Sequence, residues 1–127
     1  MIDWEADAST YSSVLDTIGH TPAVEFKRLG DELNVRIFAK LEYFSPTGSL
    51  KDRVYLELLE QAERHGELKP GMTVLECSTG NAGISCAFVA AVKGYPCIIV
   101  MPDGMSEERH KTIRAYGGEM VFTPGGE

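Results

Sequence analysis

Short apolar runs alternate with helical segments along most of the chain, and this order constrains the fold more than any other feature. We predict strands at 35–42, 73–77, 97–102 and 119–123, and helices at 49–65, 81–93 and 106–116. Strands that alternate with helices build a parallel sheet through right-handed crossovers. We therefore expect an α/β fold with an open, mainly parallel four-stranded sheet and flanking helices in three layers.

This topology predicts where a ligand would bind. In open α/β sheets the site lies beyond the carboxyl ends of the strands. Three predicted loops leave those ends, at Tyr43–Gly48, Ser78–Gly80 and Pro102–Met105, and the first two are rich in Gly, Ser and Thr. We expect all three loops to meet at one edge of the sheet.

The size and charge of the chain exclude several classes of function. With 127 residues, 43% of them hydrophobic, it suits one α/β domain, which we place at 17–127, after a polar N-terminal extension at 1–16. The net charge is −7 and Lys and Arg form no cluster, so we expect no nucleic-acid partner. No apolar run approaches the roughly 20 residues of a membrane span, so we also expect no contact with a membrane.

The cysteines and the N-terminal residues indicate a cytoplasmic protein. Cys77, Cys86 and Cys97 are odd in number and form no C-x-x-C pair. We expect reduced thiols and no metal site. The first ten residues, MIDWEADAST, lack the apolar core of a signal peptide.

The segment 45–53, SPTGSLKDR, is a turn followed by a helix start. Ser49 stands three residues before Asp52, a spacing typical of a capping box. Helical periodicity places Lys51 on a face shared with apolar residues, namely Val54, Tyr55, Leu58 and Ala62.

Two interpretations of Lys51 follow from this placement. Its aliphatic stem packs while the ammonium extends past the helix end, which is a purely structural role. Alternatively, apolar walls and the positive end of the helix dipole favour the uncharged amine, as in lysines that act as nucleophile and base.

A second segment, ECSTGNAGIS, joins a predicted strand to a helix rich in small residues. Free N–H groups at a helix N-terminus, flanked by hydroxyls and the Asn81 amide, suit an anion such as a carboxylate. The segment matches neither a Walker A loop nor G-x-G-x-x-G. Its Gly and Ala residues also permit close packing of a buried helix, which is the structural alternative.

These segments together resemble a known family. SPTGSLKDR, LECSTGNAGIS and VMPDGMSEERHKTIRAYGGEMVFT occur in the order and spacing of the cysteine synthase/cystathionine β-synthase family, which are fold type II pyridoxal-phosphate (PLP) enzymes. TIGHTPAV is similar to the opening segment of that family, so the resemblance runs from about residue 13 to the end. The expected fold then corresponds to the smaller N-terminal domain of these enzymes.

The resemblance implies a cofactor, an activity and a set of site residues. Lys51 matches the lysine that binds PLP covalently and later removes the Cα proton. Asn81 matches the asparagine that bonds the ring oxygen of the cofactor. Together with Asn81, the residues Ser78, Thr79 and Gly80 match the loop that binds the carboxylate of a small amino-acid substrate. The implied reaction is β-replacement on an activated serine such as O-acetylserine, a transferase or lyase activity of amino-acid biosynthesis.

Some positions depart from the family pattern and leave alternatives open. Asparagine is usual at Ser45 and at His20, and threonine at Ala82. The sequence Pro-Thr-Gly-Ser before Lys51 is also similar to the corresponding segment of threonine synthases and dehydratases of the same fold type. A third alternative is a catalytically silent α/β module that binds a small amino acid or a partner protein.

The length of the chain is the largest departure. Family members have a second domain with the glycine-rich loop that holds the PLP phosphate. We interpret the final TPGGE as the segment after the fourth strand and not as that loop. We therefore expect a piece of a longer protein, or a short form that associates with a chain supplying the second domain. The chain alone is expected to hold PLP weakly or not at all. Its uncovered apolar surface predicts a homo-oligomer such as a dimer.

Overall fold

The computed structural model describes residues 10–125, so part of the predicted extension (1–9) and part of the terminal glycine pair (Gly126) lie outside the described residues. The short helix η1 (Val14–Thr17) is followed by an arm that contains β1 (Ala23–Glu25), α1 (Lys27–Leu33) and β2 (Phe38–Lys40). The body of the fold contains, in order, η2 (Glu42–Phe44), α2 (Lys51–Arg64), β3 (Val74–Cys77), α3 (Asn81–Lys93), β4 (Cys97–Pro102), α4 (Glu107–Ala115) and β5 (Glu119–Thr123).

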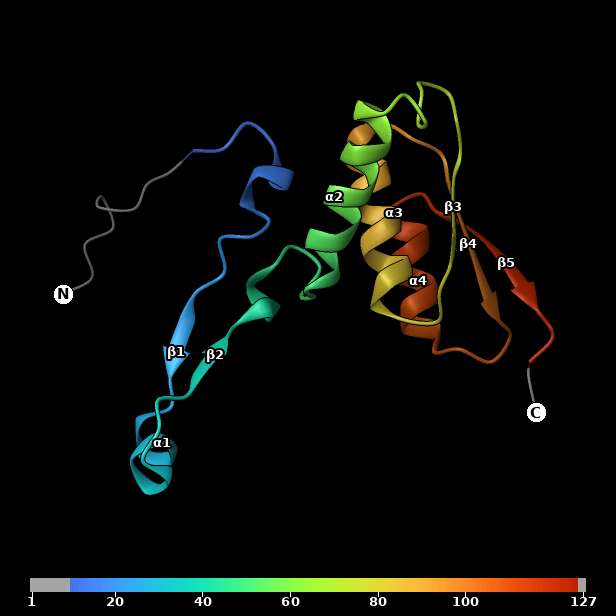
Figure 1. The fold of residues 1–127 in the computed structure, drawn as a ribbon. Helices are drawn as coiled ribbons and strands as arrows, with labels where there is room; N and C mark the ends of the chain where they lie inside the picture. Colours follow the sequence, from blue (N-terminus) through green and yellow to red (C-terminus); the bar gives the residue numbers. More distant parts are fainter. Residues whose placement is uncertain (1–9, 126–127) are drawn as a thin grey trace.

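The sheet of the body has three parallel strands in the order β3-β4-β5, so the prediction of four parallel strands is wrong. The fourth candidate, predicted at 35–42, is the short strand β2, which pairs antiparallel with β1. Alternating apolar and polar residues predict a half-exposed strand but do not specify its partner. Here the nearby segment Ala23–Glu25 provides that partner, and the resulting arm extends away from the body (Figure 1).

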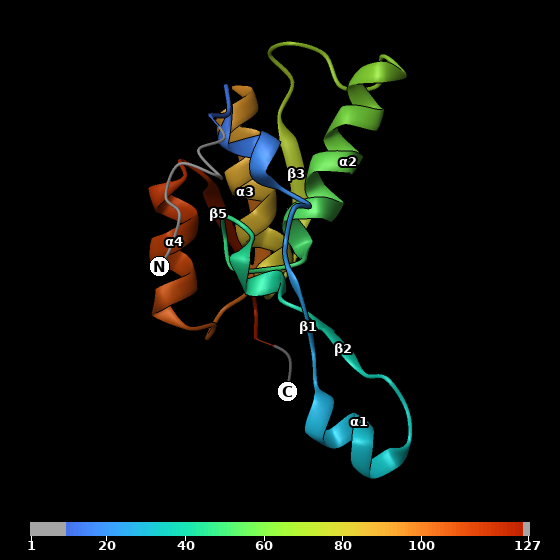
Figure 2. The same cartoon turned by 90° about the vertical axis from the view of Figure 1, so that its left-hand side faces the viewer.

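The helices α2, α3 and α4 lie on one face of the sheet, and both views show this arrangement (Figures 1 and 2). Two successive right-handed crossovers in the same direction place α3 and α4 on the same side. Within residues 10–125 no helix covers the other face, so the predicted third layer is not seen in the described part of the chain.

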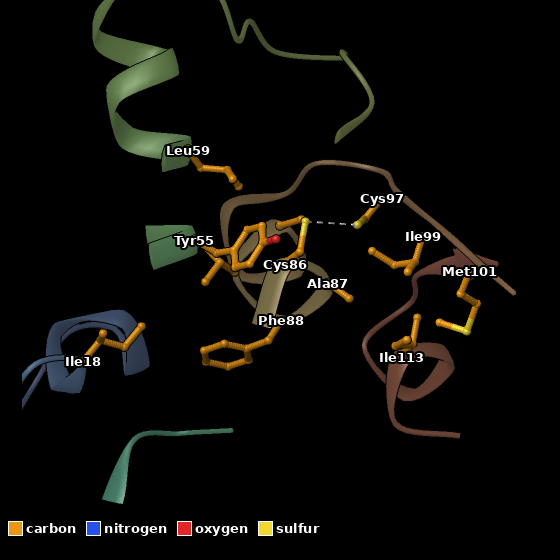
Figure 3. Close-up of a cluster of buried hydrophobic side chains, with 12 residues drawn as sticks. Ile18, Tyr55, Leu59, Cys86, Ala87, Phe88, Cys97, Ile99, Met101 and Ile113 are labelled. Carbon is orange, nitrogen blue, oxygen red and sulfur yellow. Dashed lines mark hydrogen bonds between the residues drawn. The ribbon is translucent and has the colours of Figure 1, made fainter. Parts of the chain in front are cut away.

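The core lies between the sheet and α3. Along β4, Cys97, Ile99 and Met101 are buried and alternate with partly exposed residues. Tyr55 and Leu59 of α2 reach the other side of α3 (Figure 3). A Cβ atom at Gly83 would lie 3.1 Å from Cγ2 of Ile99, so glycine lets the first turn of α3 approach β4 closely. This contact fixes the start of α3 over the carboxyl end of the sheet.

The two buried cysteines of this core, Cys86 and Cys97, lie close together. The Sγ atoms of Cys86 and Cys97 lie 3.9 Å apart (Figure 3), and all three cysteines are free. The contact between the two thiols lowers the pKa of Cys97, while the same contact and burial raise the pKa of Cys86.

Most predicted element boundaries agree with the structure. The helix predicted at 81–93 and the strands at 97–102 and 119–123 have the bounds of α3, β4 and β5. Gly94 has a φ of 80° and ends α3 in the left-handed conformation that glycine favours. Helix α1 was not predicted, because its seven residues include Gly30 and its N-cap, Phe26, forms no side-chain cap.

The uncovered face of the sheet is apolar. Leu75 is 67% exposed and Val121 is 51% exposed, and both lie on the same face as Ile98 and Val100. The arm also exposes large apolar side chains, at Val24, Phe26, Leu29, Leu33, Val35 and Phe38. Exposed apolar surface of this extent is typical of a surface that another polypeptide covers. In residues 10–125, no helix has the length and apolar character needed to cross a membrane.

An ion pair joins the ends of α2 and α3 that are remote from the candidate site. Glu63 accepts hydrogen bonds from Nζ of Lys93 at 2.8 Å and from the hydroxyl of Tyr95 at 2.9 Å. The Lys93 ammonium, supported by Tyr95, holds the pKa of Glu63 below its ordinary value of 4.5, although partial burial acts in the opposite direction.

We expect Glu63→Gln to lower the free energy of unfolding at pH 7 by roughly 0.5–1 kcal/mol. A carboxylate with a lowered pKa stabilises the fold above its unfolded value of 4.5 and loses that effect as the pH falls through the folded value. The difference between wild type and variant should therefore shrink below pH 4.5. Urea denaturation at several pH values measures it, with the exposed Glu107→Gln as control. A difference that is equally large in acid contradicts this account.

Candidate active site

Two helix N-termini meet at one end of the fold. Helix α2 begins at Lys51 and helix α3 begins at Asn81, and the two helices lie side by side in both views (Figures 1 and 2). Three residues separate the end of β3 from Asn81, so Asn81 lies at the carboxyl edge of the sheet. This is the edge at which the topology predicts a ligand site.

Lys51 lies at the border of the buried face of α2. The fully or nearly fully buried residues of this helix are Asp52, Tyr55 and Leu59. The buried face is therefore turned by one position from the predicted face that Lys51 shares with Val54, Tyr55, Leu58 and Ala62. Lys51 is half-buried, and beside it runs a stripe of exposed apolar residues, Leu50, Val54 and Leu58. Lys51 is therefore at the boundary between the buried face of α2 and an exposed apolar stripe of the same helix.

The predicted capping box between Ser49 and Asp52 is only half correct. The Ser49 hydroxyl accepts a hydrogen bond from the backbone N–H of Lys51 at 3.1 Å, which supports the helix start. The Asp52 carboxylate does not return to Ser49. It accepts instead from Thr47, because the turn before the helix folds back over it.

Asp52 is the centre of a buried polar network that sequence reasoning missed. Its side chain has no exposed surface. The carboxylate accepts from the backbone N–H of Thr47 at 2.8 Å, from the Thr47 hydroxyl at 2.5 Å and from the Ser85 hydroxyl at 2.6 Å. Ser85 is itself fully buried in α3. A serine in an otherwise apolar helix was the available signal, since a buried hydroxyl requires a partner.

The loop Tyr43–Gly48 reaches the site by a route that differs from the prediction. Its preceding strand, β2, does not belong to the parallel sheet. The loop is held against α3 through Thr47, whose hydroxyl lies 3.2 Å from that of Ser85. Packing of α2 on α3, and not sheet topology, therefore brings this loop to the candidate site.

The loop at 78–80 precedes α3, and the Ser78 side chain caps the start of this helix. The Ser78 hydroxyl oxygen accepts from the backbone N–H groups of Gly83 at 3.0 Å and Gly80 at 3.3 Å. Its hydrogen remains available to a ligand. Thr79 and Asn81 are exposed, and the N–H groups of the first helical turn have no acceptors within the helix. These donors suit a carboxylate.

A second polar network joins α2 to the segment before the arm. Arg53 donates from Nε to Glu42 at 2.9 Å and from a terminal nitrogen to the Thr21 hydroxyl at 2.8 Å. The Arg53 guanidinium, with the Thr21 hydroxyl, lowers the pKa of Glu42. This network attaches the TIGHTP segment to the helix that carries Lys51.

The described residues contain a small cavity at the start of α3. It measures about 210 Å³ and is bordered by residues of α3 and of the first turns of α4, namely Asn81, Ile84, Ser106, Glu108, Arg109 and Thr112. A larger cavity of about 480 Å³ lies in the arm around Gly30 and Arg36. The first cavity adjoins the candidate site through Asn81, although Lys51 is not among the residues that border it. The second contains neither Lys51 nor Asn81 and has no candidate nucleophile among its bordering residues.

The groups at this end of the fold fit an aldehyde cofactor with a ring oxygen. Lys51 is a half-buried residue whose amine can form a covalent bond with an aldehyde carbon. Asn81 offers an exposed amide that can donate to an anionic ring oxygen. The first turn of α3 provides further donors for the carboxylate of an amino acid.

Comparison with known proteins identifies the family. The family model for "Pyridoxal-phosphate dependent enzyme" matches residues 14–127. The chain belongs to this family. Its members use PLP, so the cofactor implied by the sequence resemblance and the groups found at the site agree.

Within this family, the chain is similar to cysteine synthases and to an O-ureido-L-serine synthase. The chain is 46% identical over 115 residues to a cysteine synthase of Staphylococcus aureus, covering 91% of this chain and 37% of that protein. It is 50% identical over 115 residues to the O-ureido-L-serine synthase of Streptomyces lavendulae, covering 91% of this chain and 35% of the relative. The crystal structure of a cysteine synthase from Entamoeba histolytica superposes with a TM-score of 0.87 at 41% identity, over 94% of this chain and 36% of the other. The chain thus spans little more than a third of the length of these relatives.

Proposed function

We propose that this chain is the first part of a PLP-dependent enzyme of the cysteine synthase type. The observation that carries the proposal is the pairing of Lys51 and Asn81 at the starts of two packed helices, in a chain that belongs to the PLP-dependent family. We further propose that 17–127 form a single domain in that enzyme.

We infer distinct roles for the groups of this chain in β-replacement. When bound, PLP withdraws electrons from the substrate Cα. The first turn of α3, with Thr79 and Asn81, orients the substrate carboxylate. The Lys51 amine takes the proton from Cα. The leaving group on Cβ then departs with the electron pair of its bond, and the sulfur of a thiol or sulfide bonds to Cβ. Lys51 returns the proton to Cα.

We propose that the apolar surfaces of this chain are covered by further polypeptide in the working enzyme. Almost two thirds of the length of the relatives lies outside the part that this chain matches. The uncovered sheet face and the stripe beside Lys51 are the surfaces that such a segment would bury. A second copy of the chain, or a chain that supplies the second domain, would provide it. The three free cysteines suit a cytoplasmic location, where thiols stay reduced.

Site mapping with the cofactor itself tests the proposal. The protein is incubated with increasing concentrations of PLP and reduced with borohydride, and the modified lysines are identified by mass spectrometry. Six lysines compete in the same sample, including the exposed Lys69 and Lys111. We expect Lys51 to be modified at a concentration about ten-fold lower than these two, a difference of about 1.4 kcal/mol. Modification of Lys51 no earlier than of exposed lysines contradicts the proposal.

The substrate is tested in the same experiment. An amino acid that binds at the site would compete with the Lys51 amine for the cofactor aldehyde, and it would so lower the modification of Lys51. We expect O-acetylserine to lower it at concentrations at which threonine and O-phosphohomoserine do not. The reverse order would indicate threonine chemistry. Protection by none of these amino acids, with Lys51 still modified first, would indicate a module that retains the cofactor site without this substrate class.

A further inference from the structure

We propose that Asp52 is a positioning residue, which fixes the end of α2 that carries Lys51 against the start of α3. The inference deepens the proposed function and depends on it for the meaning of Lys51. Its structural basis is the buried network of Thr47, Asp52 and Ser85.

The carboxylate of Asp52 joins three separate segments. It is bonded to Thr47 in the loop before α2 and to Ser85 in α3, and it belongs itself to the first turn of α2. The contact between the hydroxyls of Thr47 and Ser85 closes the triangle. Three short bonds within one buried cluster hold these segments in a single arrangement.

The network is close in the chain to both candidate cofactor residues. Lys51 is the chain neighbour of Asp52, and Asn81 lies four residues before Ser85, one turn away on the same face of α3. A shift of α2 along α3 would therefore break the bond from Ser85 and move the Lys51 amine relative to the Asn81 amide. Displacement of a reacting group by about 1 Å can reduce the rate of a reaction by about a hundred-fold.

The charge of Asp52 supports this role. Within residues 10–125 no ion pair includes Asp52, so its buried carboxylate is offset by hydrogen-bond donors and by the N-terminal end of α2. A buried polar group in a core otherwise built from apolar contacts specifies one arrangement, because any other leaves it without partners. A leucine at this position could pack but could not fix the register of the two helices.

Three variants distinguish a positioning role of Asp52 from a general effect on the stability of the fold. Asp52→Ala removes the centre of the network, and Asp52→Asn keeps its shape and can still accept from the N–H of Thr47. Ile113→Val, a loss of one methyl group in the core from α4, serves as a control that lowers stability without touching the network. Each variant is titrated with PLP and reduced with borohydride as for the wild type.

We expect Asp52→Ala to raise the PLP concentration for half-modification of Lys51 by roughly ten-fold or more, and Asp52→Asn by less. Ile113→Val should stay within about two-fold of wild type, because it leaves the Lys51 end of α2 in place. Equal modification in Asp52→Ala and wild type overturns the inference. An Ile113→Val effect as large as that of Asp52→Ala also overturns it, since the loss would then follow stability alone.

Hydrogen exchange provides a readout that needs no cofactor. In Asp52→Ala we expect the amide of Thr47 and those of the first turn of α2 to exchange roughly ten-fold faster, while the amides of 86–90 in α3 stay protected. Unchanged exchange at Thr47 counts against the network as an anchor. If exchange responds as expected but PLP does not prefer Lys51 in the wild type, the positioning of α2 stands and the proposed function fails.

Discussion

Lys51→Ala is expected to abolish covalent attachment of PLP at the candidate site. No other lysine belongs to the first turns of α2 or α3, so no neighbouring amine can replace it there. The absorbance of lysine-bound PLP should fall to the level contributed by exposed lysines. In an assembly with the remainder of the catalytic unit, β-replacement should decrease by roughly a thousand-fold or more, because both the covalent link and the base at Cα are lost.

Lys111→Ala is the matched control for this experiment. Lys111 lies in a helix, pairs with Glu107 and has a side chain that is 71% exposed. Its loss should lower the absorbance only by the small share that one exposed lysine contributes, and it should leave the rate unchanged. Retention of the full absorbance in Lys51→Ala would mean that PLP binds another lysine, and the assignment of the site would be wrong.

Ile99→Ala is expected to destabilise the fold by about 2–5 kcal/mol. The side chain of Ile99 is fully buried and lies against Gly83, so its truncation leaves a cavity directly beneath the first turn of α3. Such a loss is a large fraction of the 5–15 kcal/mol of a typical domain. Urea denaturation followed by circular dichroism measures it, and PLP modification of Lys51 should weaken in the same variant.

Leu75→Ala provides the contrast on the uncovered face. Leu75 lies in β3, next to β4, but is 67% exposed. Its truncation should change the free energy of unfolding of this chain by no more than about 0.5 kcal/mol. Similar losses in Ile99→Ala and Leu75→Ala would contradict a core confined to the helix side of the sheet. A loss in Leu75→Ala that depends on protein concentration would show that a second copy covers this face.

Local patterns predicted the elements of the body because those elements depend on local chemistry. The apolar run of β4 and the small-residue run of α3, which ends at Gly94, each carry their signal in consecutive residues. The pairing partner of a strand is not determined by consecutive residues. The alternation of apolar and polar residues around Phe38 predicted a strand. Its pairing with Ala23–Glu25 depends on tertiary structure, which this alternation does not specify.

The residues of the candidate site differ in the same way, because some have local sequence signals and others depend on tertiary contacts. Lys51 and Asn81 were found from a helix start and a strand-to-helix loop, both of which are local signals. Asp52 was misassigned to a capping box, because its true partners, Thr47 and Ser85, are 5 and 33 residues away in sequence. A carboxylate within an apolar stripe indicates a buried partner without identifying it.

The most direct test of the account is whether Lys51 and Asn81 respond to the same ligand in the same titration. The side-chain amide of Asn81 can be followed by nuclear magnetic resonance while PLP is added, and the modification of Lys51 is measured on the same samples. We predict that the Asn81 amide signal shifts and saturates at the PLP concentration that saturates Lys51. An Asn81 signal that stays in place while Lys51 becomes modified would contradict the account, because the two helix starts would then not form one site.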